Sequence, residues 1–295
     1  MSYLEPEAPI GMHLHAIHPV RPEYLHARNL PPRTLKLRAW IEGQIEMSGT
    51  PVSLPESDLH LSIFHPTDAS REELFEVAKA SEDRQLPYWA DIWPSGLALA
   101  SVALQRSDEL AGMRVLELGS GLGTTAAATL KAGASVLALD YSPLALAVCR
   151  YNALMNVGVS PRTLPANWRD LRSSTLTRLE AAGPFPIIMA SDVLYESRDI
   201  EPLIDLIDRL LAPEASSGFP SRAGKSRGIS GYPRTSRLAI HDQQMKAGGA
   251  RKGPATINVH FLRRELSYPP VRHRQAGGFD RHPDLLPDNL GADFD

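Results

Sequence analysis

Three glycines at alternate positions follow a short apolar run near the middle of the chain, and this feature constrains the fold more than any other. In the stretch VLELGSGLGTTAAATLKAGASVLALDYS, Val115 to Ser142, a segment of small residues separates the glycines from a second apolar run that ends at Asp140. A strand, a glycine-rich turn, a helix and a second strand in this order make a βαβ unit with parallel strands. We therefore expect a nucleotide-type ligand where those strands end.

Strands and helices continue to alternate beyond this unit. The apolar patterns predict buried strands and covering helices in turn, the strands at 113–118, 135–140, 162–168 and 185–192 and the helices at 122–133, 142–158 and 200–213. Strands that read as continuous apolar runs belong to a parallel sheet with both faces covered. The sequence thus predicts an α/β fold with a mostly parallel sheet and helices on both of its faces.

Regular segments also flank this central region. Alternating apolar residues predict short strands or a hairpin between Gln44 and Pro66. A helix is expected over residues 68–82, capped by Asp68 or Ser70 and acidic in its first turn, and a buried helix from Trp93 to Arg106. Two closing strands are predicted near the carboxyl terminus, at 237–245 and 256–266.

The chain divides into three parts. Residues 1–45 show no sustained period and are expected to form a flexible N-terminal segment, residues 46–265 to form the α/β domain, and residues 266–295 to be a disordered tail. A fifth buried strand is expected after Pro213, but residues 214–236 are rich in Gly, Ser, Arg and Pro. Two alternative explanations of this irregular fifth-strand region stay open: a long flexible insertion, or a local reading-frame error.

Composition and charge exclude several kinds of partner. The formal net charge of -3 gives no electrostatic reason to expect nucleic acid or an anionic membrane, and no stretch reaches the roughly 20 apolar residues of a spanning helix. The N-terminus lacks the pattern of a signal peptide. Packing is the favoured role of the single cysteine, Cys149. We expect a cytoplasmic monomer that binds neither nucleic acid nor membranes.

No metal site is expected from the histidines near the N-terminus. His13, His15 and His18 alternate, so an extended segment would place at least two of them on one side. A metal site would need further ligands and an ordered frame, and the sequence shows neither. We interpret these three side chains as solvated.

The spacing of the glycine loop and its two acidic neighbours favour a cationic ligand without phosphate. The dinucleotide fingerprint G-x-G-x-x-G needs its third glycine where this chain has Thr124, because the glycines fall at Gly119, Gly121 and Gly123. Glu117 would repel a pyrophosphate and hold a positive charge. Asp140 stands where a carboxylate can accept hydrogen bonds from ribose hydroxyls. S-adenosylmethionine has this chemistry, and its carboxylate suits the amides after Gly121.

Three stretches in this order resemble a known family. LELGSGLG is similar to the first motif of the seven-strand, class I S-adenosylmethionine-dependent methyltransferases. Together with LPYWADIWPSGLALA before it and SDVLYE after it, this motif resembles methyltransferase family 16. That family includes protein lysine methyltransferases, among them those that act on the electron-transfer flavoprotein β subunit. Its bacterial members are often labelled predicted nicotinamide N-methylases. The resemblance covers residues 86–213 and implies a Rossmann-like seven-stranded sheet.

The resemblance also implies roles for individual residues. The loop that shapes the methionine end of the cofactor pocket would consist of Glu117, Gly119, Gly121 and Gly123. Further cofactor contacts, to the ribose, the adenine and the covering ring, would come from Trp89, Trp93, Asp140, Tyr141, Asn167, Trp168 and Ser191. Some of these residues have a simpler interpretation: the glycines could be purely structural, the tryptophans could cover or fill apolar core, and Asp140 could be a polar strand end.

Asp192 and Tyr195 are the predicted catalytic pair. Asp192 follows the apolar run IIMAS, so it leaves the sheet at the edge where ligands bind in open α/β folds. The alternative role of Asp192 is to cap the following helix or turn. We expect Asp192 to orient the acceptor amine rather than to act as a strong base, because a carboxylate with a pKa near 4 is poorly matched to an amine. Tyr195 would line the channel.

Other functions remain open at this point. An NAD-dependent oxidoreductase uses the same strand, loop and helix, although the glycine spacing and Glu117 count against it. No feature of the sequence separates methylation of a protein lysine from methylation of a small amine such as a pyridine. A catalytically impaired binding protein is a further alternative because of the irregular residues 214–236.

Overall fold

The computed structural model describes residues 30–194, 196–212, 237–247 and 255–265, the last two ranges as backbone only. At its centre lies a parallel sheet of four strands in the order β5-β4-β3-β6. The strands are β3 (Arg114–Leu118), β4 (Ser135–Asp140), β5 (Arg162–Pro165) and β6 (Ile187–Ala190). Because the sheet starts at β3, adds β4 and β5 on one side and then crosses to β6, the topological switch point lies between β3 and β6.

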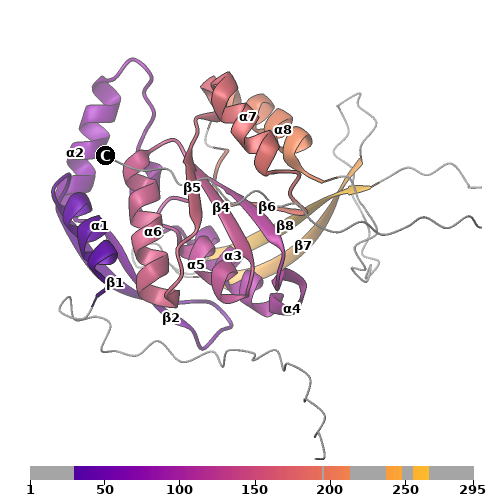
Figure 1. The fold of residues 1–295 in the computed structure, drawn as a ribbon, viewed down its shortest axis with the longest axis horizontal. Coiled ribbons are helices and arrows are strands. Elements are labelled where there is room, and N and C mark those ends of the chain that lie inside the picture. The colour runs from indigo at the N-terminus through magenta and orange to yellow at the C-terminus, as the bar shows by residue number, and fades with distance from the viewer. Residues whose placement is uncertain (1–29, 195, 213–236, 248–254, 266–295) are drawn as a thin grey trace, which may run out of the picture.

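Alternate residues of the central strands face two different cores. Val115 and Val136 pack into a cluster shared with α3 (Pro94–Gln105), α5 (Thr124–Lys131) and α6 (Pro143–Val157). Leu116 and Leu139 point to the opposite face, into the cluster that includes α7 (Ser173–Ala182) and α8 (Ser197–Leu210). The period of two along a strand therefore gives each face of the sheet its own layer of helices (Figure 1).

The N-terminal elements lie beside α6, on the first of these faces. They are α1 (Pro32–Glu42), the antiparallel pair β1 (Met47–Ser53) and β2 (His60–Pro66), and α2 (Asp68–Ala80). Two asparagines of α6 hold the free edge of β2. The Asn152 amide accepts from Phe64 N at 2.8 Å and donates to Phe64 O at 2.9 Å. Asn156, one helical turn later, does the same with Ser62. Side-chain amides thus satisfy the backbone groups that a further strand would pair.

Short elements complete the description. The tryptophan segment, residues 87–96, contains η3 (Tyr88–Ala90), and η4 (Trp168–Asp170) follows β5. A four-residue helix, α4 (Ser107–Leu110), precedes β3, and β7 (Arg237–Ala247) pairs antiparallel with β8 (Ala255–Glu265). Within the described ranges, no helix is both long enough and apolar enough to cross a membrane.

The structure bears out most of the predicted elements and corrects several. The hairpin, the helix after it, the buried helix α3, the central βαβ order and the two closing strands all form. The cap of α2 is Thr67, which accepts from Ser70 N, rather than Asp68 or Ser70. Helix α1 lies inside the segment 1–45 that was expected to be flexible; Pro32 occupies its first turn, where a missing N–H is harmless.

The sheet differs from the expected seven strands. Four strands of the described chain join it, and β7 and β8 form a separate pair. Leu211 makes a parallel bridge with Phe185, just before the point at which the described residues stop. The irregular residues 214–236, the predicted tail 266–295 and the three N-terminal histidines lie outside the described part.

Gly123 and Gly158 provide a matched pair for testing the glycine loop. Both have positive φ, at 77° and 74°, but a Cβ on Gly123 would lie 2.6 Å from Cys149 Sγ and 2.7 Å from its Cα, whereas one on Gly158 would meet open space. Gly158→Ala should therefore lower the free energy of unfolding by about 1 kcal/mol from backbone strain. Gly123→Ala should lower it by about 3 kcal/mol, because overpacking is added. Urea denaturation measures both, and equal losses would contradict this packing.

Candidate functional site

Four loops meet at the carboxyl edge of the parallel sheet. Leu118 pairs with Leu139 and with Ala190 in the sheet, so the residues that follow these strands come together. The glycine loop leaves β3, Asp140 ends β4, and η4 begins three residues beyond β5. The loop that carries Ser191 and Asp192 leaves β6. The predicted site residues therefore come from four strands that are dispersed in sequence but adjacent in the sheet.

Each of the first two glycines is in contact with a predicted site residue. Gly119 has φ 68°, and a Cβ there would lie 2.6 Å from Val193 Cγ1 and 3.7 Å from the Trp168 ring. Gly121 has φ 49°, and a Cβ there would lie 3.5 Å from the backbone oxygen of Trp89. The positive φ favours glycine at both positions, and the close approach of Val193 adds a steric reason at Gly119. The loop is thus enclosed by the tryptophan segment on one side and by Trp168 and Val193 on the other.

Cys149 packs directly against Gly123 and is fully buried. Burial raises the pKa of its thiol well above the ordinary value. A thiol that stays protonated is a poor nucleophile, so the packing role expected for this cysteine agrees with its position.

The two acidic residues are buried beside each other on one face of the sheet. Asp140 accepts hydrogen bonds from Gly121 N and Ser142 N, both at 3.0 Å. Burial nevertheless raises the pKa of Asp140 to about 6, against the opposing effect of these backbone hydrogen bonds. Burial and the charge of Asp140 raise the pKa of Glu117 to about 8. At neutral pH Glu117 is therefore mostly protonated, and a neighbouring cation would favour its charged form.

Buried polar atoms without a partner gather at this edge. Within the described ranges, four buried side-chain atoms make no hydrogen bond: Glu117 Oε2, Ser120 Oγ, Trp168 Nε1 and Ser191 Oγ. Ser120 lies near the Cys149 thiol and Trp168 near Asp199, but neither contact has hydrogen-bond geometry. Buried polar atoms are almost always paired in native proteins. All four lie in the last residues of the strands or in the segments that follow them at the carboxyl edge, as expected if a ligand completes their hydrogen bonding.

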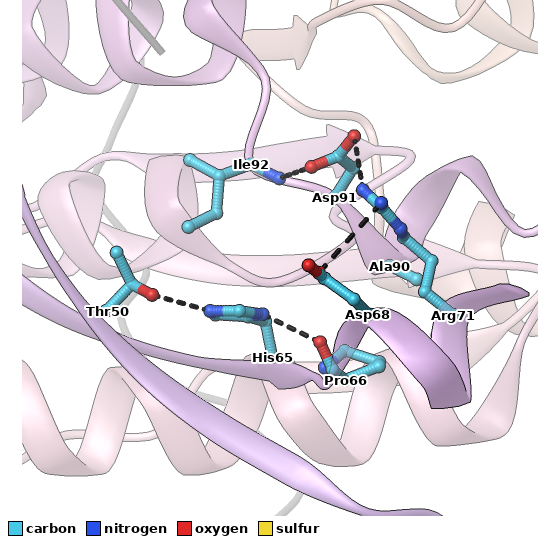
Figure 2. Close-up of a pocket in the computed structure, with 8 residues that line it drawn as sticks. All are labelled: Thr50, His65, Pro66, Asp68, Arg71, Ala90, Asp91 and Ile92. Atoms are coloured by element: carbon cyan, nitrogen blue, oxygen red, sulfur yellow. Dashed lines mark hydrogen bonds and ion pairs between the residues drawn. The ribbon is translucent and has the colours of Figure 1, made fainter. Parts of the chain in front are cut away.

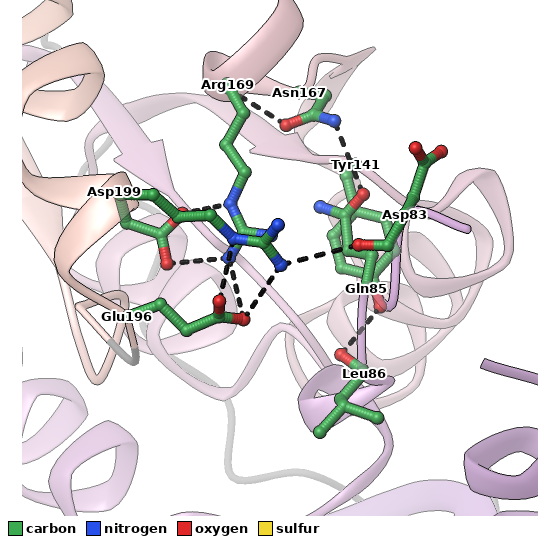
Figure 3. Close-up of polar contacts among 9 residues, drawn as sticks. Asp83, Gln85, Leu86, Tyr141, Asn167, Arg169, Glu196 and Asp199 are labelled. Carbon is green, nitrogen blue, oxygen red and sulfur yellow. Dashed lines mark hydrogen bonds and ion pairs between the residues drawn. The ribbon is translucent and has the colours of Figure 1, made fainter. Parts of the chain in front are cut away.

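Two predicted cofactor residues are engaged with the segment that precedes the tryptophans. Tyr141 Oη donates to Leu86 O at 3.0 Å, and Asn167 Nδ2 donates to Gln85 Oε1 at 3.3 Å (Figure 3). Asn167 Oδ1 also accepts from Arg169 N at 3.1 Å and so caps η4. Asn167 was predicted to lie near an adenine amine; the structure uses its side chain to hold the Gln85 loop and to cap η4.

An ion-pair network ties η4 to α8 on the same side. The Arg169 guanidinium contacts both carboxylate oxygens of Asp199, one of them at 2.8 Å, and Glu196 at 3.3 Å (Figure 3). Burial of Asp199 would raise its pKa, but the hydrogen bonds and charge of Arg169 outweigh it and lower the pKa. Arg198 joins Glu196 to the backbone oxygen of Asp83 at 3.4 Å. Sequence reasoning missed this network, whose members are far apart in the chain.

The loop after β6 places Asp192 against the start of α3. Asp192 is exposed and has φ 48°, a left-handed conformation that is costly for a residue with a side chain. Its Oδ2 accepts a hydrogen bond from Ser95 Oγ. No pattern in the sequence indicates Ser95, which stands 97 residues before its partner. Tyr195, the other predicted catalytic residue, lies outside the described residues.

The two tryptophans of the tryptophan segment lie on different sides. Trp89 is buried in the core next to Gly121. Trp93 is half-buried, caps the N-terminus of α3 through its backbone, and donates from Nε1 to Tyr88 O at 2.7 Å. Trp89 is therefore the one whose position fits the covering role; Trp93 lines a separate cavity.

A small polar cavity lies between the tryptophan segment, the β1–β2 hairpin and the start of α2. It has a volume of about 60 Å³ and is lined in part by His65, Arg71 and Asp91 (Figure 2). His65 Nε2 is 2.7 Å from Thr50 Oγ1 and its Nδ1 is 2.8 Å from Pro66 O. Arg71 pairs with Asp91 at 3.1 Å. All these polar groups are satisfied, and in the part of the chain that the structure describes no three His, Cys, Asp or Glu residues could hold a metal ion.

Replacing Glu117 with Gln should flatten the pH dependence of stability. The pKa of Glu117 is raised in the folded state. Its contribution to the free energy of unfolding is therefore fully present below the ordinary pKa of 4.5 and is lost as the pH rises through about 8. Gln cannot ionise, so at pH above 8 the variant should melt at a higher temperature than the wild type, by roughly 2–4 °C for each kcal/mol recovered. Calorimetry at acidic and alkaline pH measures this. The exposed Glu201→Gln is the control, and parallel melting curves for wild type and Glu117→Gln would refute a neutral buried carboxyl.

Comparison with known proteins finds relatives that match part of the chain. The rat electron transfer flavoprotein beta subunit lysine methyltransferase is 32% identical over 163 residues, which are 55% of this chain and 58% of that protein. The Xenopus laevis protein of the same name is 34% identical over 141 residues, 46% of this chain and 54% of its own. The human histone-arginine methyltransferase METTL23 is 31% identical over 118 residues, 39% and 60% of the two chains. The matches thus cover between half and two thirds of the length of these three relatives.

Among solved structures, the magnesium protoporphyrin IX methyltransferase of Synechocystis, determined with bound SAM, aligns with a TM-score of 0.40 at 14% identity, over 65% of this chain and 96% of that one. The family model described as lysine methyltransferase matches residues 78–225, from the end of α2 past the loop after β6. It covers the tryptophan segment, the glycine loop and the loop of Asp192. Since this match extends over half of the 295 residues, the chain belongs to the lysine methyltransferase family.

Proposed function

We propose that this protein transfers a methyl group from S-adenosylmethionine to a lysine side chain of another protein. The observation that carries the proposal is the set of unpaired buried polar atoms at the carboxyl edge, beside a protonated Glu117. Family membership supports the acceptor class, and the named relatives act on proteins, at lysine or arginine.

The residues at this edge fit the proposed cofactor. Glu117 would gain a cationic neighbour that favours its ionised form. Both Asp140 oxygens already accept backbone hydrogen bonds, and a carboxylate has about four acceptor positions, so some acceptor capacity remains for a ribose hydroxyl. Ser120 and Ser191 supply hydroxyl groups at the ends of β3 and β6. Trp89 and Trp168 flank the loop and limit its exposure to water.

The bound cofactor supplies an activated methyl group, so the chain needs no nucleophile of its own. What the protein contributes is alignment of the acceptor amine with that methyl group and exclusion of water. A lysine amine has a pKa of about 10.4 in water and must lose its proton to react, which burial against aromatic rings favours. Asp192, which accepts a hydrogen bond from Ser95 in the loop after β6, would accept a further one from the amine and orient it.

Cofactor binding should release a proton near neutral pH. Because a cation beside Glu117 lowers the pKa of that carboxyl from about 8, binding at pH 7 should expel the proton, and affinity should rise with pH up to about 8. Titration calorimetry with S-adenosylmethionine in buffers of different ionisation enthalpy measures the proton count. Glu117→Gln should abolish the release and weaken binding about tenfold or more. NAD is the control ligand; heat from NAD alone would refute the proposed cofactor.

Asp192→Ala should lower turnover about a hundredfold, because the amine loses its orientation, and should leave the cofactor dissociation constant unchanged within about twofold. Ser95→Ala keeps the carboxylate but frees it to rotate, so a smaller loss of about tenfold is expected. Transfer of labelled methyl groups to lysate proteins measures turnover, and calorimetry measures cofactor affinity. An equal loss of turnover and affinity in Asp192→Ala would place this residue in the cofactor pocket instead.

A further inference from the structure

A larger cavity is lined by Trp93 and by residues of α2. It has a volume of about 480 Å³ and lies between α2 and the tryptophan segment. We call this cavity the α2 groove. Its lining includes Glu72, Phe75, Glu76, Tyr88, Asp91 and Trp93. Its size falls in the range of sites that hold a small molecule or a side chain with its flanking backbone.

Three aromatic rings form one wall of the α2 groove. The Phe75 and Tyr88 centroids are 5.9 Å apart with the rings at 74°, and those of Tyr88 and Trp93 are 6.2 Å apart at 71°. This edge-to-face series joins α2 to the tryptophan segment. All three rings are half-buried, so part of each still faces the groove or solvent. Aromatic rings of this kind attract lysine and arginine side chains through cation–π interactions.

The charges that line the groove leave one carboxylate over. Glu76 pairs with Lys79 at 2.7 Å, and Asp91 pairs with Arg71 at 3.1 Å. Glu72, exposed on the same helix, forms no ion pair with any residue that the structure describes. Three carboxylates against two cations give the lining a net charge of -1. Both the rings and the excess charge are therefore complementary to a cation.

The tryptophan segment connects the groove to the proposed acceptor site through the chain. Trp93, which lines the groove, is the residue from which α3 begins, and Ser95 in the first turn of that helix holds Asp192. Tyr88, the middle ring of the wall, is followed in the chain by Trp89, which contacts the glycine loop. A substrate segment with one lysine at Asp192 would therefore place a neighbouring side chain along the groove.

We propose that the α2 groove binds a second basic side chain, lysine or arginine, of the protein substrate, next to the lysine that is methylated. This inference rests on the proposed function and narrows its substrate class to segments with at least two basic residues. Glu72 supplies the charge, and the Phe75 and Tyr88 rings supply the cation–π contact.

Binding of a short basic peptide tests this inference. The probe is a fluorescein-labelled peptide of glycine and serine with two lysines at alternate positions, and its counterpart has glutamates in their place. Fluorescence anisotropy should show weak, salt-sensitive binding of the lysine peptide alone. Glu72→Gln should weaken it about two- to fivefold, and Phe75→Leu by a similar factor. Glu73→Gln, the same charge change on a residue of α2 that does not line the groove, should leave it unchanged.

The same variants separate this inference from the proposed function. Cofactor affinity and melting temperature should be equal in the wild type, Glu72→Gln and Glu73→Gln, while the KM for lysate protein should rise in Glu72→Gln alone. Equal peptide binding by Glu72→Gln and Glu73→Gln, or binding of the glutamate peptide, would overturn the inference and leave methyl transfer intact. A wild-type protein that neither binds S-adenosylmethionine nor transfers methyl groups would overturn the proposed function and the inference with it.

Discussion

The hydrogen bond from the Gly121 amide to the Asp140 carboxylate joins the two central strand ends, and the geometry of the site depends on it. It fixes the glycine loop of β3 against the end of β4, while the other oxygen of Asp140 accepts from Ser142 N at the start of α6. The same arrangement places Asp140 close enough to raise the pKa of Glu117. A buried carboxyl pair of this kind is costly to ionise, so the site is more stable with a cation than without one.

The tryptophan segment, ten residues long from 87 to 96, connects three regions of the molecule. Its Trp89 backbone closes on Gly121, and its Ser95 side chain holds Asp192. Its Tyr88 and Trp93 rings continue the aromatic wall that begins at Phe75. This one segment, which forms a single 3-10 turn before α3, thus contacts the glycine loop and the loop of Asp192 and lines the α2 groove.

Elements with a regular apolar period could be predicted from the sequence, and contacts between distant side chains could not. The βαβ unit, the hairpin and α6 follow from strand and helix periods with glycine and proline at the ends. The cap at Thr67 was misplaced because several capping residue types follow one another there. Helix α1 was not predicted because two consecutive prolines, Pro31 and Pro32, are typical of a loop. Helix α7 was not predicted because its polar sequence SSTLTRLEAA has few apolar residues at helical spacing.

The predicted site residues also divide into those with a local sequence pattern and those that depend on contacts between distant segments. The glycines and the acidic strand ends follow from spacing along one βαβ unit, so their meeting at the edge was predictable. The bond between Ser95 and Asp192 and the pairing of Asn167 with Gln85 depend on how loops 97 and 82 residues apart are packed. Neither has a local signal, because each partner is an ordinary polar residue in its own segment.

The asparagines of α6 have a consequence for how such a chain can diversify. Asn152 and Asn156 hold β2 through its backbone groups, and Asn152 also donates to Leu122 O in the glycine loop at 2.9 Å. Since none of these bonds uses a side chain of the hairpin, the exposed positions of β1 and β2 carry no part of the attachment. Their chemistry is free to drift over evolutionary time while the ligand-binding frame beneath them keeps its shape.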